Sequence, residues 1–330
     1  MHRRVRAFVV TAAVGVLGLA CSSGPKPSET SERSAAAPAA RVRRSSPIGR
    51  PGASSAPGEA QLDRARAAAK AGQLDQVVTA ARAAIAEDPR LEQAYLLLGS
   101  TCALQGNDPC EAAAYRDGLA AIPTSVPLQR EMGFYLLRQG NVDEGIRRLE
   151  SAREATRTPS PSLLADLAVA YKMKGDLQKA RATAETAIEA DGTCVECYLA
   201  RGEVAFAERD FGAAERAFEA AVQKAPDNVE ARRSRAKAVY LGGDVERAAD
   251  LYLALAERAP DDVRVQVQAG QVALEAKRAE AAVRRFEAAA TLLPNEAQLL
   301  ELLAQAQDAA SDPEAAQATR ARAAALTAPP

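Results

Sequence analysis

The stretch ERDFGAAERAFEAAVQKAP, residues 208–226, carries the pattern that decides the fold. Its apolar side chains recur three and four residues apart, and this spacing places them on one face of an α-helix. They are Phe211, Ala214, Phe218, Ala221 and Val222. The proline at 226 ends the helix, because proline lacks the amide hydrogen that a further turn needs. Ala214 is small, and we expect it to let this helix approach the preceding one at Gly202.

The same pattern returns along the chain with a period of 34 residues. The closing proline recurs as Pro226, Pro260 and Pro294, the alanine as Ala214, Ala248 and Ala282, and the aromatic as Phe218, Tyr252 and Phe286. Each unit also contains a second helical stretch, separated from the first by a turn such as Gly175-Asp176 or Gly243-Asp244. Glycine suits this place because it accepts the left-handed conformation that closes a helix.

These motifs resemble the tetratricopeptide repeat (TPR) family over about four-fifths of the chain. The resemblance rests on Tyr95-x2-Leu98-Gly99, on Leu164-x2-Leu167-Ala168-x2-Tyr171, and on Ala214-x3-Phe218 followed by Pro226. It implies an all-α fold, a TPR solenoid in which helix-turn-helix repeats stack into a right-handed superhelix. One unit cannot bury its apolar face alone, so the units must stack. We expect repeats that start near residues 58, 92, 126, 161, 195, 229 and 263, with 297–327 as an eighth unit or a cap.

The N-terminus predicts a targeting segment. Arg3, Arg4 and Arg6 precede an apolar run over 7–20 that suits a signal peptide and is short for a membrane span. Cys21 follows Leu-Gly-Leu-Ala, which resembles the lipobox of bacterial lipoproteins and implies that Cys21 is acylated. An aspartate after the cysteine retains many lipoproteins in the inner membrane, and Ser22 stands there instead. We therefore expect a lipoprotein signal peptide over 1–20 and an outer-membrane lipoprotein that faces the periplasm.

Residues 21–57 are rich in Ser, Ala, Pro, Gly and Arg, and predict a disordered tether before a TPR solenoid over 58–330. The tether is basic, while 58–330 is net acidic, which argues against a nucleic-acid partner. The only histidine is His2, and no phosphate loop, nucleophile elbow or calcium loop is present in the sequence. We therefore expect no enzyme activity, no cofactor, no metal site and no small-molecule substrate.

Four cysteines remain after Cys21: Cys102, Cys110, Cys194 and Cys197. The repeat register separates the first two from the last two by several units, which argues against one four-cysteine zinc site. Outside the cytoplasm an even count favours local disulfides, pairing Cys102 with Cys110 and Cys194 with Cys197. Free thiols and a redox-active Cys194-x-x-Cys197 motif remain as alternatives, although Glu196 has the wrong charge for stabilising a thiolate.

In the TPR family the first helix of each unit lines a concave groove in which peptides bind. The resemblance transfers this role to Leu96 and Ser100, Arg130, Phe134, Leu137 and Arg138, Val169 and Lys172, Leu199, Glu203 and Phe206, Arg233, Lys237 and Tyr240, and Val267 and Gln271. Its cations predict a locally basic groove. Phe134, Phe206 and Tyr240 are either anchors for a partner or packing between neighbouring helices. The Lys/Asn arrangement that clamps a C-terminal carboxylate in some relatives is absent from the sequence, and Arg233 with Lys237 matches it only in charge.

These features favour a membrane-anchored TPR scaffold for another envelope protein. The chain resembles the pilotin-type lipoproteins of type IV pili and the adaptors of cell-wall enzymes, so assembly of an envelope, pilus or secretion complex is the implied role. An accessory role in outer-membrane assembly is a second interpretation. A periplasmic thiol-redox protein that uses Cys194 and Cys197 is an alternative from another class.

Overall fold

A computed structural model describes residues 56–327, and all regular structure in this range is helical. The helices are α1 (Ala56–Lys70), α2 (Leu74–Glu87), α3 (Glu92–Leu104), α4 (Asp108–Ala121), α5 (Val126–Arg138), α6 (Val142–Glu154), α7 (Pro161–Lys174), α8 (Leu177–Ala190), α9 (Val195–Ala207), α10 (Phe211–Lys224), α11 (Val229–Leu241), α12 (Val245–Arg258), α13 (Val263–Glu275), α14 (Ala279–Leu292), α15 (Ala297–Ala309) and α16 (Pro313–Thr327). They form eight consecutive pairs, so the prediction of an all-α repeat fold is confirmed.

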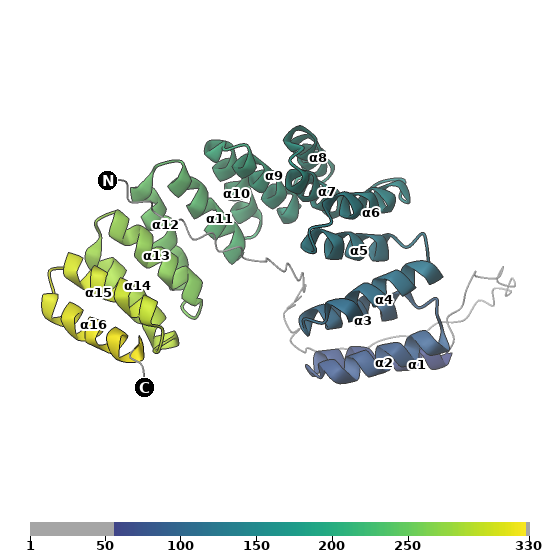
Figure 1. Ribbon diagram of the computed structural model, residues 1–330. Coiled ribbons are helices and arrows are strands. Elements are labelled where there is room, and N and C mark those ends of the chain that lie inside the picture. Colours follow the sequence, from purple (N-terminus) through teal and green to yellow (C-terminus); the bar gives the residue numbers. More distant parts are fainter. Residues whose placement is uncertain (1–55, 328–330) are drawn as a thin grey trace, which may run out of the picture.

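The pairs stack side by side into an open arc, with α1 and α2 at one end and α15 and α16 at the other (Figure 1). Each helix packs against the helices before and after it in the chain. The first helices α5, α7 and α11 lie on the inner side of the arc, and their partners α6, α8 and α12 lie on the outer side (Figure 1). In these three units the inner side of the arc is therefore formed by first helices.

The predicted signal peptide and Cys21 lie outside the described residues. The expected tether also lies outside them, except at its end, where α1 begins at Ala56, two residues earlier than the sequence predicted. No helix in the described range is both long enough and apolar enough to cross a membrane.

In several units a glycine of the first helix faces an aromatic ring of the second helix. A Cβ atom added to Gly202 of α9 would lie 2.4 Å from Cε1 of Phe218 in α10. The same arrangement recurs between Gly270 of α13 and Phe286 of α14, where the distance would be 2.7 Å. Gly202 therefore makes room for the ring of Phe218, a contact that the sequence did not predict, and Ala214 is buried in the same cluster.

The turn inside each unit requires one residue with a left-handed backbone. Glycine holds this conformation at Gly72, Gly106, Gly140, Gly175 and Gly243. In the other three units the same place is taken by Arg209, Lys277 and Ser311, with φ angles of 61°, 58° and 65°. A side chain in this region costs about 1–2 kcal/mol. The stacked helices on both sides hold the turn in these three units without the help of glycine.

Candidate functional site

The inner surface of the arc is the candidate site, and most of the predicted groove residues are at least partly accessible there. Leu96, Arg130, Phe134, Val169, Lys172, Leu199, Phe206, Arg233 and Tyr240 are half-buried, whereas Arg138 and Lys237 are exposed. Among the additional positions, Ser100, Glu203 and Val267 are half-buried and Gln271 is exposed. These side chains come from α3, α5, α7, α9, α11 and α13, so six units contribute to the surface.

Leu137 does not belong to this surface, and its assignment to the groove was wrong. Its side chain is 5% exposed and packs in a core cluster with Ile146 and Leu149. Gly145 of α6 explains the difference, since a Cβ atom there would lie 2.8 Å from Cγ of Leu137. The missing side chain at Gly145 leaves a space between α5 and α6, and Leu137 fills it.

The three predicted aromatic anchors pack against the core on one side. The ring centroid of Phe206 lies 5.1 Å from that of the fully buried Phe218 and 6.2 Å from that of Phe211. Phe134 and Tyr240 pack in the same way on the core clusters of their own units. All three are nevertheless only half-buried. Part of each ring is structural, and part remains available on the surface of the solenoid.

Charged side chains contact each of these three residues. The guanidinium carbon of Arg130 lies 5.5 Å from the ring centroid of Phe134. Lys237 Nζ lies 5.5 Å from the ring centroid of Phe206 and so joins α11 to α9. The Tyr240 hydroxyl donates a 2.7 Å hydrogen bond to Glu275 of α13. Cation–π contacts at exposed sites contribute about 0.5–1 kcal/mol each. The Lys237–Phe206 contact connects two neighbouring units, whereas Arg130 and Phe134 lie on the same helix.

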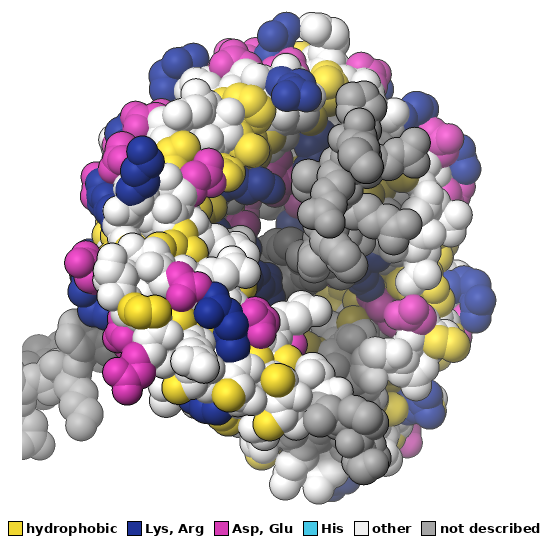
Figure 2. All heavy atoms as spheres, turned by 60° about the vertical axis from the view of Figure 1, so that its left-hand side comes forward, with side chains coloured by type: hydrophobic (Ala, Val, Ile, Leu, Met, Phe, Trp, Pro, Cys, Tyr) yellow, Lys and Arg dark blue, Asp and Glu magenta, His cyan; other side chains and the backbone are white. Residues whose placement is uncertain are grey.

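The expectation of a locally basic groove was wrong, because carboxylates neutralise most of the predicted cations. The ion pairs are Arg130–Asp166 at 2.5 Å, Lys172–Glu203, Arg233–Glu230 and Arg138–Glu111. Lys237 makes no ion pair among residues 56–327, and its contact is with the Phe206 ring. On the face seen in Figure 2, basic and acidic side chains are interspersed over the surface. The groove therefore offers paired charges of both signs beside apolar side chains.

Asp166 of α7 is a groove residue that sequence reasoning missed. Burial raises the pKa of its carboxyl group to about 6, although the hydrogen bond from Arg130 opposes this shift. The carboxylates of Glu131 and Glu196 also face Asp166 and raise the pKa further. The sequence could have indicated this pair, because Asp166 follows Arg130 by about one repeat and so lies at a similar place in the next unit. The groove thus contains one acid that changes charge near pH 6.

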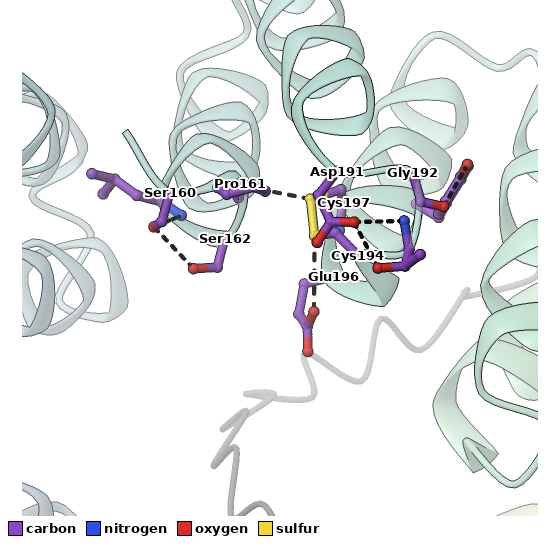
Figure 3. The surroundings of a disulfide bond; sticks show 11 residues. Ser160, Pro161, Ser162, Asp191, Gly192, Cys194, Glu196 and Cys197 are labelled. Carbon is purple, nitrogen blue, oxygen red and sulfur yellow. Dashed lines mark hydrogen bonds between the residues drawn. A yellow bond between two sulfur atoms is a disulfide. The ribbon is translucent and has the colours of Figure 1, made fainter. Parts of the chain in front are cut away.

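The structure joins the cysteines in two local pairs. The Cys102–Cys110 bond connects α3 to the first turn of α4, and the Cys194–Cys197 bond spans the start of α9 (Figure 3). Within residues 56–327, no group of three or more His, Cys, Asp or Glu side chains is arranged to hold a metal ion. Each bond lies inside a single repeat unit and therefore acts locally.

The surroundings of Cys194 and Cys197 suit a structural bond. Cys194 caps α9, since its sulfur accepts the Cys197 amide at 3.2 Å, and the two residues are 9% and 0% exposed. The sulfur of Cys197 lies 3.4 Å from the carbonyl oxygen of Pro161 in α7, which is a packing contact because a bonded sulfur carries no proton (Figure 3). The Glu196 carboxylate lies 3.9 Å from the Cys194 sulfur and opposes a thiolate there. These contacts argue against a redox centre at this pair.

Eight stacked pairs of antiparallel helices with a first-helix inner surface define the class of α-helical repeat solenoids. The family model described as Tetratricopeptide repeat matches residues 62–126, 131–193 and 199–263, which is more than half of the chain. The chain therefore belongs to the tetratricopeptide repeat family. No curated protein matches its sequence.

Solved structures show the same fold at low sequence identity. A tetratricopeptide repeat protein from Parabacteroides merdae is 16% identical, with a TM-score of 0.57 over 76% of this chain and 98% of that one. PilW, described as a type IV pilus biogenesis factor, is 15% identical, with a TM-score of 0.56 over 62% of this chain and 94% of its own. PilF of Pseudomonas aeruginosa is 18% identical, with a TM-score of 0.51 over 63% and 95%. At these identities the likeness concerns the fold.

Proposed function

We propose that this chain is a membrane-anchored scaffold of the bacterial cell envelope that binds another envelope protein on the inner surface of its solenoid. Tetratricopeptide repeat domains are protein-interaction scaffolds. The observation that carries the proposal is the inner surface itself. It combines half-buried rings of three units, Phe134, Phe206 and Tyr240, with ion pairs between neighbouring units.

The anchor is supported by the N-terminal sequence. An arginine-rich start, an apolar run over 7–20 and Cys21 at its end have the order found in a lipoprotein signal. Acyl chains on Cys21 would hold the protein at a membrane, since each buried methylene contributes about 0.8 kcal/mol. Ser22 favours the outer membrane facing the periplasm. Two local disulfides suit an oxidising compartment.

The pathway is supported only by resemblance. PilW shares the fold and is described as a type IV pilus biogenesis factor. A role in assembling a pilus, secretion or other envelope complex is the finer proposal that this likeness supports. The groove residues favour an extended or helical protein segment with apolar side chains, since these pack on exposed ring surfaces. The paired charges in the groove favour a segment that carries both acidic and basic groups.

The anchor is tested by fractionating cells that express Cys21→Ser, with Ser22→Ala as the matched control. We expect Cys21→Ser to move into the soluble periplasmic fraction while Ser22→Ala stays with the membranes. If Cys21→Ser still sediments with membranes after a salt wash, the anchor proposal is wrong. This outcome leaves the proposed binding surface untouched, because no residue of that surface takes part in the anchor.

A further inference from the structure

The two disulfides differ in the solvent exposure of their cysteines. Cys102 is 0% exposed, whereas its partner Cys110 is half-buried and lies in the first turn of α4. In the other pair, Cys194 and Cys197 are both buried. A thiol in solution can therefore approach the first bond through Cys110, while the second bond is shielded on both sides.

The charges around Cys110 also differ from those around Cys194. The Arg82 guanidinium of α2 donates a hydrogen bond to the Cys110 sulfur at 3.7 Å. Arg82 makes no ion pair with any carboxylate of residues 56–327, so its charge is available to the sulfur. The amide of Cys110 is bound by the capping Asn107 side chain at 3.2 Å, which places the sulfur at the positive end of α4.

Two acidic residues flank Cys110 closely in sequence, and both have partners. Glu111 is 2% exposed and is paired with Arg138 through one of its oxygens. Asp108 accepts a hydrogen bond from Gln139 Nε2 at 3.2 Å. Arginine and a helix N-terminus attract an incoming thiolate anion, and they stabilise the thiolate of Cys110 once it is released. Arg82 and the start of α4 both lie close to the Cys110 sulfur. The negative charge of the buried Glu111 is offset by its ion pair with Arg138.

We propose that Cys102–Cys110 is an exchangeable disulfide that reacts with thiols through Cys110, whereas Cys194–Cys197 is a permanent structural bond. An attacking thiolate bonds to the Cys110 sulfur and releases Cys102 as a thiolate, which takes a proton. A second thiol, once deprotonated, then attacks the sulfur bound to Cys110 and releases Cys110 as a thiolate beside Arg82. Two external thiols become one external disulfide, and two electrons and two protons reduce the protein bond. The co-reactant is a small, unhindered thiol.

This activity goes beyond scaffolding, and it can be tested without knowing the binding partner. The folded full chain is incubated with reduced glutathione, quenched by alkylation, and mapped by peptide mass spectrometry. We expect the glutathione adduct on Cys110, accumulating at least about tenfold faster than any modification of Cys194 or Cys197. Peptide mapping reads Cys21 separately, so the state of the anchor does not affect the result.

Glutathione approaches the Cys110 sulfur as an anion, and the Arg82 guanidinium beside that sulfur attracts it. Arg82→Gln should therefore slow the appearance of the Cys110 adduct by about fivefold, and Arg82→Lys should retain most of the rate, because it keeps the charge. Arg116→Gln is the matched control, since Arg116 occupies the same place in the next second helix and pairs with Asp117. It should leave the rate unchanged. Circular dichroism of each variant checks that the solenoid is folded. Equal reaction of the two pairs, an adduct on Cys102 in place of Cys110, or an unchanged rate in Arg82→Gln would each overturn the proposal.

Discussion

Replacing Gly202 by alanine tests the packing that shapes each unit. The added Cβ atom would lie 2.4, 2.6 and 2.7 Å from three carbons of the Phe218 ring, whereas carbon atoms in contact lie about 3.5–4.0 Å apart. The ring is 0% exposed and is enclosed by Ala205, Ala214 and Ala238, so it cannot simply turn aside. Either the ring or the helix must therefore move by about 1 Å.

The expected cost follows from two opposing effects. Overpacking a core typically costs about 1–3 kcal/mol, and alanine gains about 1 kcal/mol over glycine within a helix. Because all three contacts are far shorter than an ordinary contact, the overpacking cost lies in the upper part of this range, at about 2–3 kcal/mol. After the gain from alanine, we expect Gly202→Ala to lower the free energy of unfolding by about 1–2 kcal/mol. Gly212→Ala is the matched control in the same unit. The nearest atom to its added Cβ lies 3.6 Å away, so this variant should be neutral or more stable.

Urea unfolding followed by circular dichroism measures both variants. The midpoints are compared at similar slopes, because a repeat protein can unfold in more than one step. Phe218→Leu in the Gly202→Ala background removes the ring and should recover part of the loss. A Gly202→Ala protein at least as stable as the wild type would refute the reasoning, because the two helices would then not be held apart by this contact.

Three further predictions concern the turns, the buried acid and the inner surface. Lys277 has a left-handed backbone with φ of 58°, which glycine adopts without strain. Lys277→Gly should therefore raise the free energy of unfolding by about 1 kcal/mol, whereas Lys277→Ala should not, and urea midpoints measure both. Asp166 has a pKa of about 6 in the folded chain against 3.8 as its reference, so the folded state holds its proton more tightly. The resulting stabilisation is fully present below about pH 4 and is lost as the pH rises through about 6, so wild-type stability relative to Asp166→Asn should fall by about 2–3 kcal/mol between these limits. A pH-independent difference in urea midpoints would contradict this. Phe206→Ala should cost about 2 kcal/mol of stability, less than the 3–5 kcal/mol of a fully buried phenylalanine such as Phe218, because only part of its ring is buried; a loss in melting as large as that of Phe218→Ala would assign the whole ring to the core.

Repeat positions could be predicted from the sequence because their signals are local. The first helices begin at Glu92, Val126, Pro161, Val195, Val229 and Val263, the places at which the 34-residue period puts the unit starts. Proline, glycine and the apolar spacing act within one unit, and they needed no knowledge of neighbouring units. The left-handed turns at Arg209 and Lys277 were not predicted, because glycine is the residue that indicates such a turn in a sequence and neither position has one.

The inner surface was harder to predict, because it depends on how units pack against each other. Leu137 turns into a space that Gly145 leaves in the next helix. Arg130 and Lys172 find carboxylates on the following unit, and a register alone does not show which side chains meet across a unit boundary. The sequence therefore predicted the helices that form the surface but misjudged its charge.

A second missed feature fixes the loops between units. The fourth residue of several units donates a hydrogen bond to the carbonyl oxygen six residues earlier. Gln129 binds Pro123 at 3.0 Å, Tyr198 binds Gly192 at 3.3 Å, Arg232 binds Pro226 at 2.6 Å, and Gln266 binds Pro260 at 3.4 Å. The available signal in the sequence was a polar side chain at the fourth residue of the unit, where other units carry an apolar one. These bonds fix each loop to the helix that follows it.

The central claim, that the inner surface binds another envelope protein, is tested most directly by photo-crosslinking in living cells. A photoreactive amino acid is placed at Val169 or Leu199 on the inner helices α7 and α9, and at Thr186 or Arg216 on the outer helices α8 and α10. We predict a discrete adduct of one envelope protein from Val169 and Leu199, and none from Thr186 and Arg216. Adducts only from the outer positions, or the same adducts from all four, would contradict the account.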